Sequence, residues 1–308
     1  MSKPLISPIA AIVFLLSTCG HVVAAIISVP NASFESPTAL SPLPNLSSWQ
    51  KTSKPGWYDE GGGQFLWIQL TGIFKNTLAT NSNHINNCDG LQAAWLFAVP
   101  EVGLFQDYDS VDWNDPAPTH DFNATYEPGK SYHFTVGVIG TGGNMQEGVT
   151  LDLSLYYRDG ASNRIAIALT TLTNTPMVFS NNTHLVDCYV NLPVVKASDA
   201  WAGRKIGIQF VSTVSAELQG GYWDLDNVRL ISKIAPAFTN PIHTNGQFQC
   251  TLQSEPSLTF QIFASTNVAL PSSNWASVGF VTNVTGTIPF IDTPVNFPQR
   301  FYQARQLP

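Results

Sequence analysis

The chain has 308 residues, of which only 11% are charged, and its formal net charge is −7. A typical soluble domain has roughly 25% charged residues, and the low value here, with abundant Thr, Ser, Asn and Gly, is usual in secreted β-proteins. The 14 basic residues are scattered singly along the chain. Without a Lys/Arg stripe, we expect neither a nucleic-acid partner nor attachment to an anionic membrane. The length is sufficient for two domains.

Residues 1–25 have the pattern of a signal peptide. Lys3 supplies the positive charge, residues 9–16 (IAAIVFLL) form a short apolar core, and Ala24 and Ala25 offer small residues for cleavage. The apolar run is too short to span a bilayer, and no second stretch is long enough for a transmembrane segment. We therefore predict a secreted or cell-surface protein cut after Ala25, with Ala24 as the other cleavage position and lipidation at Cys19 as an alternative.

Short alternating segments dominate the rest of the chain, and helical periodicity is almost absent. Alternation between bounding Gly, Pro, Asn and Asp residues is typical of sandwiches and barrels, so we predict an all-β fold. The segment 65–70 (FLWIQL) is apolar on both faces, which predicts one buried face and one that displays aromatic rings. The expected strands are 65–70, 132–138, 150–157, 205–211 and 220–230.

A domain boundary is expected near residues 232–241 (SKIAPAFTNP), where two prolines follow a finished strand. Beyond it, about 70 residues have their own apolar alternation, which is enough for a small sandwich with a marginal core. We predict a first domain at 26–232, a linker at 233–241 and a second domain at 242–308.

Three cysteines remain after the expected cleavage: Cys88, Cys188 and Cys250. In an oxidising compartment an odd number permits one disulfide and one leftover thiol. Cys88 and Cys188 share the first predicted domain, so they are the pair that could be bridged. Three free thiols in strands are the alternative.

Two short motifs frame the first domain. The mature chain opens with Asn31-Ala32-Ser33-Phe34-Glu35, and the domain closes with the run 223–230 (WDLDNVRL), while 89–94 (DGLQAA) lies between them. An N-x-x-F-E opening and a closing D-[DN]-V-x-L strand resemble the jelly-roll carbohydrate-binding-module superfamily, also called galactose-binding-like. The resemblance implies an antiparallel jelly-roll β-sandwich.

The tail, from 260 to 304 (FQIFASTNV to FYQA), resembles a fibronectin-like C-terminal module common in secreted proteins of the Planctomycetes–Verrucomicrobia group. This resemblance implies a bacterial source and a small fibronectin/immunoglobulin-like β-sandwich after the jelly roll, with a role in spacing or surface display.

The closing strand contains two acids, Asp224 and Asp226, among apolar residues. If Val228 and Leu230 point inward, a period of two sends both acids inward as well. If Trp223 and Leu225 point inward instead, both acids face water and Val228 needs a bulge to regain the core.

The jelly-roll resemblance implies a structural Ca²⁺ between the first and last strands, with Glu35 and Asp226 as carboxylate ligands and backbone carbonyls completing the six to eight oxygens that Ca²⁺ prefers. The alternative is that Asp226 accepts backbone N–H groups at a strand bulge. For Asp224 we expect a solvated side chain.

An acidic loop at 106–121 is the sharpest candidate for catalysis. It is open whether the loop is merely solvated, holds a second metal ion, or supplies a carboxylate pair for hydrolysis, in which case Asp112→Asn or Asp115→Asn would abolish turnover. No H-E-x-x-H, G-x-S-x-G or Walker pattern is present, which argues against an enzyme. The loop's ionisable residues are Asp107, Asp109, Asp112, Asp115, His120 and Asp121.

Aromatic side chains are the remaining functional material, because the apolar faces of sugars stack on Trp and Tyr. Trp57, Tyr58, Trp67 and Trp113 lie in or beside loops or on the less buried strand face and are the expected ligand-binding residues, whereas Trp95 in AAWLFAV is expected in the core and Trp223 is ambiguous.

The sequence therefore predicts a secreted, non-catalytic protein that binds carbohydrate or another extracellular polymer through a calcium-stabilised jelly roll. The alternatives are a structural or surface-display protein, and a jelly-roll hydrolase or cyclase that uses the loop 106–121. Binding weakened by Trp67→Ala or Trp113→Ala would support the first of these.

Overall fold

The computed structural model describes residues 25–61, 64–244, 247–293 and 299–307. The predicted signal peptide, with Lys3 and Cys19, lies outside these residues except for Ala25. In the part of the chain that is described, no helix is long and apolar enough to cross a membrane. The chain divides into two compact units, one spanning Ile26–Ser232 and the other containing Lys233 onward.

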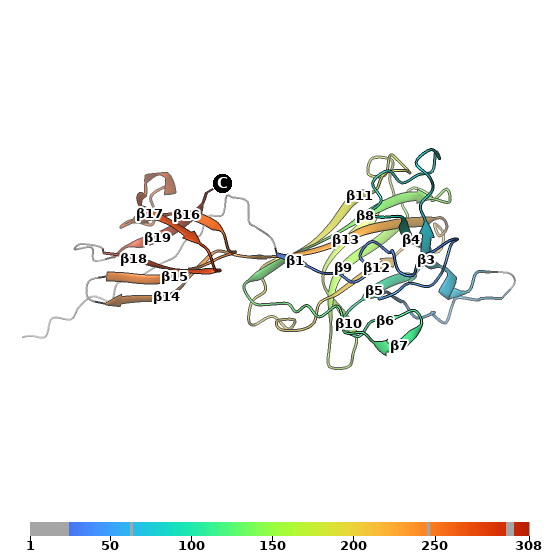
Figure 1. The fold of residues 1–308 in the computed structure, drawn as a ribbon, viewed down its shortest axis with the longest axis horizontal. Helices are drawn as coiled ribbons and strands as arrows, with labels where there is room; N and C mark the ends of the chain where they lie inside the picture. The colour runs from blue at the N-terminus through green and yellow to red at the C-terminus, as the bar shows by residue number, and fades with distance from the viewer. Residues whose placement is uncertain (1–24, 62–63, 245–246, 294–298, 308) are drawn as a thin grey trace, which may run out of the picture. The chain divides into compact units, whose positions relative to one another are not determined.

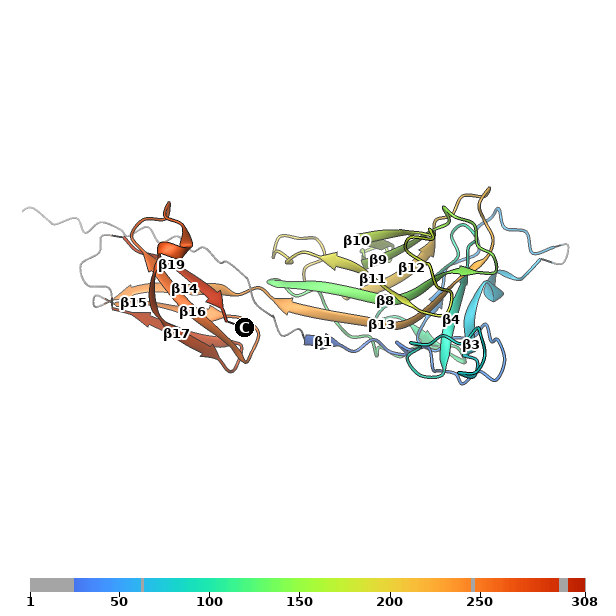
Figure 2. The same cartoon turned by 90° about the horizontal axis from the view of Figure 1, so that it is seen from above.

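Two antiparallel sheets face each other in the larger unit, as Figures 1 and 2 show. The first sheet has the order β11 (Val186–Leu192), β8 (Lys130–Gly142), β13 (Tyr222–Ile234), β4 (Gln92–Phe97), β3 (Thr71–Lys75), and β1 (Ala25–Ile27) also pairs with β13. The second has the order β10 (Arg164–Thr173), β9 (Thr150–Arg158), β12 (Gly207–Ser212), β5 (Gly103–Gln106), β2 (Gln50–Lys51). A hairpin of β6 (Val111–Asp112) and β7 (Asp115–Pro118) adjoins them. The predicted all-β jelly-roll sandwich is confirmed.

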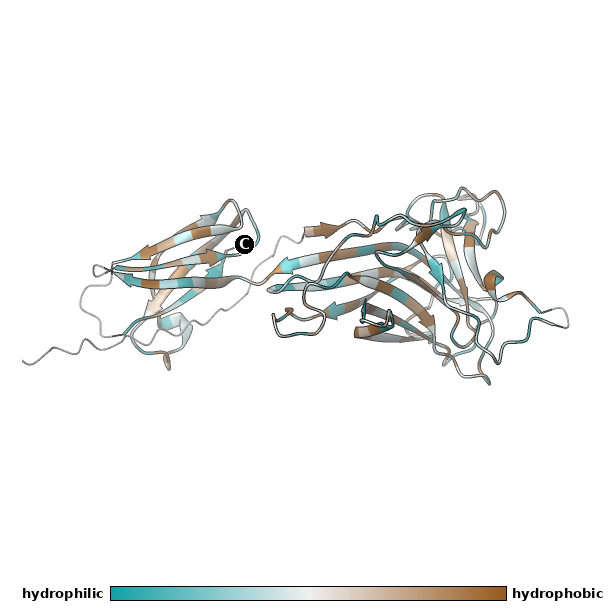
Figure 3. Ribbon diagram, turned by 90° about the horizontal axis from the view of Figure 1, so that it is seen from below, coloured by the Kyte–Doolittle hydropathy of each residue, from teal (hydrophilic) through white to brown (hydrophobic). Residues whose placement is uncertain are grey.

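The core of this unit lies between the sheets, where alternate residues of each strand meet. In β9, Leu151, Leu153 and Leu155 are fully buried, and Figure 3 shows apolar and polar residues alternating along the strands. Aromatic rings fill the centre: Phe34 lies 5.3 Å from Trp49, which stacks on Phe210 at 5.2 Å. The Phe of the N-x-x-F-E opening is thus a core residue.

Strand β13 buries residues on both of its faces. Trp223, Leu225, Val228 and Leu230 all lie in the core, and the three-residue step from 225 to 228 requires an irregularity in the strand. Asn227 supplies it with a left-handed backbone, φ 55°. Of the two alternatives for this strand, the structure has the inward Trp223 and Leu225 of the second, with the irregularity that brings Val228 back to the core.

The two acids of β13 nevertheless do not face water. Asp226 is 0% exposed and Asp224 is 9% exposed. The expectation that Asp224 is solvated is therefore wrong. Loops cover the outer face of the sheet at this point, so Asp224 is enclosed although its side chain points away from the core.

The segment 65–70, expected as a strand, is a loop with a single 3₁₀ turn at Trp67–Gln69. The Leu66 N–H donates to the Gln69 side chain at 2.9 Å, and the Trp67 indole N–H donates to the Thr52 carbonyl at 2.6 Å. The first bond satisfies the backbone N–H of Leu66, and the second anchors the Trp67 ring. The other four predicted strands fall within or overlap β8, β9, β12 and β13.

The smaller unit is a β-sandwich of its own. One sheet contains β14 (Ala237–Thr244), β15 (Gln247–Gln253) and β18 (Thr287–Asp292), and the other contains β17 (Ala276–Asn283), β16 (Leu258–Ser265) and β19 (Phe301–Gln306), with a 3₁₀ turn at Ser272–Asn274. Rings from both sheets meet in its core, where Phe248 stacks on Tyr302 at 4.4 Å.

The boundary between the units is shorter than expected. β13 extends to Ile234 and β14 begins at Ala237, so most of the predicted linker 233–241 is strand. Pro241, which in the sequence indicates a linker, lies where the register of β14 shifts between Thr239 and Ile242, a position at which a strand tolerates proline.

Candidate functional site

A pocket of about 860 Å³ lies on the outer face of the first sheet, over β3, β4, β13 and β8. Its volume is within the range of about 300–1,000 Å³ that is common for ligand sites. Loops before β3, after β3, after β8 and before β11 contribute the remaining walls. The lining residues are Pro42, Pro44, Phe65, Gln69, Phe74, Thr77, Asn83, Ile85, Trp95, Phe97, Ile139, Thr141, Gly142, Gly143, Asn144, Asn182, Tyr222 and Asp224.

Aromatic rings form the floor of this pocket because cross-strand neighbours share a sheet face. Trp95 lies opposite Asp224 on one side and opposite Gly72 on the other, and Phe97 lies opposite Tyr222. A Cβ at position 72 would lie 2.3 Å from the Trp95 ring. Gly72 therefore allows the indole to lie across β3.

The aromatic surface continues toward the mouth of the pocket. The Phe97 ring lies 5.9 Å from that of Tyr222 and 5.5 Å from that of Phe65. Phe65 is exposed and also lines the pocket, so it stands at the boundary with solvent. The Tyr222 ring covers Gly142, where a Cβ would lie 2.4 Å from it.

Asp224 is the polar centre of the pocket. Its Oδ1 atom is buried and has no hydrogen-bond partner among the described residues, and the same holds for the Thr141 hydroxyl. Burial raises the pKa of the Asp224 carboxyl from 3.8 to about 7. Burial, and then the nearby charge of Asp224, raises the pKa of Tyr222. A polar group buried without a partner costs free energy, so both atoms are suited to bind a ligand.

A second site lies where the two ends of the larger unit meet. β1 pairs with β13, and the Val228 N–H donates to the Ala32 carbonyl at 3.0 Å. The carboxylates of Glu35 and Asp226 both accept hydrogen bonds from the backbone of the turn 89–92. Glu35 Oε1 accepts the N–H groups of residues 91 and 92 at 2.7 Å each, and Asp226 Oδ2 accepts that of residue 89 at 2.5 Å.

The donor set at this turn fits a cation in one respect. Asp226 Oδ1 is buried and has no hydrogen-bond partner in the described structure, and burial raises the pKa of this carboxyl to about 7. Burial and the charge of Asp226 also raise the pKa of the neighbouring Cys88 thiol. No three His, Cys, Asp or Glu side chains form a metal-binding group within the described ranges, so backbone carbonyls would have to supply most of the ligands.

The structure also decides between the alternatives for the cysteines. Cys88, Cys188 and Cys250 are all free thiols. Burial raises the pKa of Cys188 and of Cys250 to about 12, so both thiols stay protonated and behave as small core residues.

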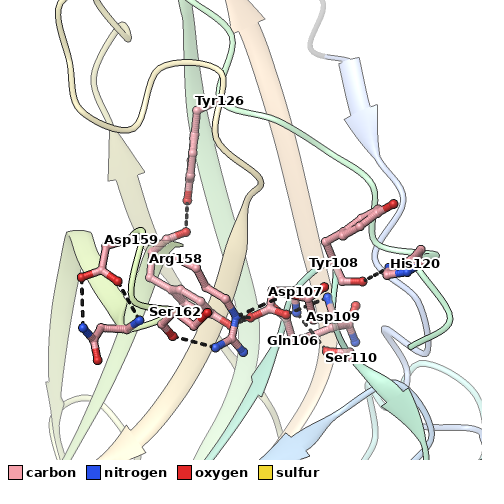
Figure 4. A network of polar contacts seen from close by, with 12 residues as sticks. Gln106, Asp107, Tyr108, Asp109, Ser110, His120, Tyr126, Arg158, Asp159 and Ser162 are labelled. Atoms are coloured by element: carbon pink, nitrogen blue, oxygen red, sulfur yellow. Dashed lines mark hydrogen bonds and ion pairs between the residues drawn. The ribbon is translucent and has the colours of Figure 1, made fainter. Parts of the chain in front are cut away.

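Acids of the loop 106–121 are divided between two places, the Arg158 network and the β6–β7 hairpin, instead of forming one site. Asp107 is buried, and Figure 4 shows it beside Arg158, whose Nε lies 2.7 Å from Asp107 Oδ2. The same oxygen accepts the Tyr156 hydroxyl at 2.6 Å. His120 stacks on Tyr108 at 4.0 Å instead of facing an acid. Asp112 and Asp115 face each other across the β6–β7 hairpin, and Asp109, Asp115 and Asp121 are exposed. The bonds of Asp107 are those of a structural ion pair.

Three of the four aromatic residues expected to bind ligand form one cluster away from the pocket floor. Trp67 contacts Tyr58 at 5.0 Å and Trp57 at 6.3 Å, both edge to face. Trp67 is only 5% exposed and belongs to the core, so it presents no free face. Trp57 is 50% exposed, and Trp113, in the β6–β7 turn, is 47% exposed.

Sequence reasoning missed the two residues that define the pocket. Trp95 was expected in the core, and Asp224 was expected in water. Tyr222 and Asp224 lie opposite Phe97 and Trp95, so all four side chains share one face of the sheet. The sequence of neither segment indicates that β13 pairs with β4. Only the core face was predictable from the apolar run.

No protein-family model matches the chain, and no curated protein matches its sequence. Among solved structures, a Stig cyclase, Fisc from Fischerella sp. TAU, is 19% identical, and the match covers 69% of this chain and 100% of the cyclase with a TM-score of 0.48. A xylan-binding CBM22 domain of Xyn10C from Paenibacillus barcinonensis is 11% identical over 68% of this chain and 96% of that domain, with a TM-score of 0.36. The xylan-binding module CBM15 is 10% identical over 70% and 98%, with a TM-score of 0.33.

Proposed function

We propose that the pocket over β3, β4, β13 and β8 binds a saccharide outside the cell. The pocket combines the two kinds of group that sugar recognition requires. Trp95, Phe97 and Tyr222 offer aromatic faces to the apolar side of a sugar ring. Amide side chains and the Asp224 carboxyl can exchange hydrogen bonds with its hydroxyls.

One observation carries this proposal: Asp224 Oδ1 and the Thr141 hydroxyl lack partners among the described residues, in a pocket lined by aromatic rings and amide side chains. Polar atoms buried in a protein core are almost always hydrogen-bonded. A ligand hydroxyl that reaches Asp224 would remove the cost of burying it. Core packing alone would not favour an acid at this position.

The proposal includes Ca²⁺ as a structural ion at the turn 89–92. Glu35 and Asp226 would hold it, because their carboxylates grip this turn and Asp226 Oδ1 is free to bind. Such an ion would supply positive charge to two acids and join the opening and closing segments of the sandwich. Ligand binding itself would be performed by the pocket residues.

A panel of immobilised neutral and amino polysaccharides, with soluble oligomers for titration calorimetry, tests the proposal. Trp95→Ala should weaken binding at least about tenfold, since truncating an aromatic side chain at the centre of a binding site costs about 2 kcal/mol or more and each ~1.4 kcal/mol is a factor of ten. Trp57→Ala is the matched control, because its ring is exposed and away from the pocket lining. No binding to any polysaccharide would overturn the proposal and favour a structural or surface-display role.

A second candidate function is proton transfer by Asp224, which moves the enzymatic alternative from the loop 106–121 to the pocket. Asp224 is the only carboxyl among the described lining residues, and aromatic rings surround it. One enclosed acid beside an apolar cavity is an arrangement used for general acid catalysis. Conversion of a bound compound by the wild type, with binding but no conversion by Asp224→Asn, would establish this function instead.

A further inference from the structure

We infer that the saccharide bound by this pocket carries a protonated amine, so that an amino sugar is the preferred ligand class. The inference rests on the proposed function, and it deepens it by assigning a charge to the ligand. The structure offers three observations that point the same way: the charges of the lining, the position of the aromatic rings, and the free oxygen of Asp224.

The charged groups of the lining have one sign. Among the described residues that line the pocket, Asp224 is the only Asp or Glu, and none is Lys, Arg or His. An anionic ligand, such as a uronate or a sulfated sugar, would meet a carboxyl and no cation. The net charge of the whole chain, −7, acts in the same direction.

The aromatic rings lie where they would stabilise a cation. Trp95 is the direct cross-strand neighbour of Asp224, and Tyr222 precedes it by two residues on the same face of β13. The face of an aromatic ring carries partial negative charge and attracts an ammonium group within about 6 Å of its centre. A cation at Asp224 would therefore have a carboxylate beside it and aromatic side chains at the neighbouring positions of β4 and β13.

The free atom completes the argument. Asp224 Oδ1 is buried and without a partner in the described structure. By contrast, Asp107, another buried acid of this unit, has an ion pair with Arg158. Burial of a carboxylate without a counter-charge is costly. An ammonium group of the ligand would take the place that Arg158 takes at Asp107, with a charge-assisted hydrogen bond to Oδ1.

The test compares three trisaccharides by titration calorimetry near neutral pH: those of glucosamine, N-acetylglucosamine and glucose. Only the first is charged, and acetylation of the amine removes that charge while the ring is kept. We expect the glucosamine trimer to bind about tenfold more tightly, or more, than the other two. In Asp224→Asn the preference should disappear, whereas the exposed-acid control Asp115→Asn should retain it.

The outcomes separate the two levels of the argument. Equal or tighter binding of a neutral trimer by the wild type would overturn this inference and leave saccharide binding intact. A preference for the amine that survives in folded Asp224→Asn would also overturn it, because another group would then recognise the charge. Failure of all three trimers, together with the polysaccharide panel, would overturn the proposed function itself.

Discussion

Replacing Asp224 by Asn should make the stability of the larger unit less dependent on pH. Burial raises the pKa of this carboxyl from 3.8 to about 7. Between these two values the folded state keeps a proton that the unfolded state releases. Stability is therefore lost as the pH rises through this window and is constant again above it.

The size of the effect follows from the two pKa values. Each pKa unit corresponds to ~1.4 kcal/mol, so the full change from 3.8 to about 7 makes folding ~4 kcal/mol less favourable above neutral pH than at about pH 4. Asn is neutral and nearly isosteric, so Asp224→Asn removes this part. Asp226, whose pKa is also raised to about 7, keeps its own part in the variant.

Urea unfolding followed by tryptophan fluorescence at several pH values measures this difference. Wild type and Asp224→Asn should have similar stability in acid, and the variant should be the more stable protein at neutral pH. Asp115→Asn, an exposed acid on β7, should run parallel to the wild type. If the Asp224→Asn curve is parallel as well, the carboxyl is solvated and the enclosed pocket described here is incorrect.

Three further predictions concern the turn 89–92, the Asp107 network and the pocket floor. Chelation of Ca²⁺ should lower the melting temperature of the wild type but not that of Asp226→Asn. The bound ion contributes ~2.7 kcal/mol to the free energy of unfolding at a hundredfold excess of metal over the dissociation constant. An unchanged wild-type melting temperature would show that no Ca²⁺ is bound at this turn. Asp107→Ala should cost about 1–3 kcal/mol in chemical denaturation, because the buried Tyr156 hydroxyl loses the Asp107 oxygen that accepts its hydrogen bond and the half-buried Arg158 keeps only Asp109, at 4.0 Å; no measurable loss would show that the pair is solvated. Gly72→Ala should displace the Trp95 ring, since the new Cβ would lie 2.3 Å from it, and should cost about 1–3 kcal/mol together with ligand binding; a stable variant with normal binding would contradict the placement of the ring.

The parts of the fold that could be predicted from the sequence are those set by local periodicity. Alternation in 150–157 is written in the segment itself, and β9 has the core face that it implies. The prolines at 236 and 241 indicate a boundary region, but they do not predict that β14 begins at Ala237, between them. Phe34 and Val228 are far apart in the sequence of the first unit but belong to the same core. Only the resemblance to jelly rolls predicts that these two segments come together.

The site was harder to predict because it depends on contacts between distant segments. The run AAWLFAV is apolar on both faces, so the sequence cannot say which face loops will cover, and Trp95 was assigned to the wrong one. The enclosure of Asp224 depends on the loops around Pro42 and Thr77, which have no periodicity. Similarly, the Trp67 segment alternates like a strand, yet it forms a 3₁₀ turn that side-chain hydrogen bonds hold in place.

Fluorine NMR of the protein labelled with 5-fluorotryptophan, during titration with the tightest-binding saccharide, tests the location of the site most directly. Single Trp→Phe variants would assign the resonances. A ligand in the pocket should shift the Trp95 resonance and leave that of Trp113, on the β6–β7 hairpin, unchanged. A shift confined to Trp57 or Trp113, with Trp95 unmoved at saturation, would place the binding surface elsewhere on the molecule.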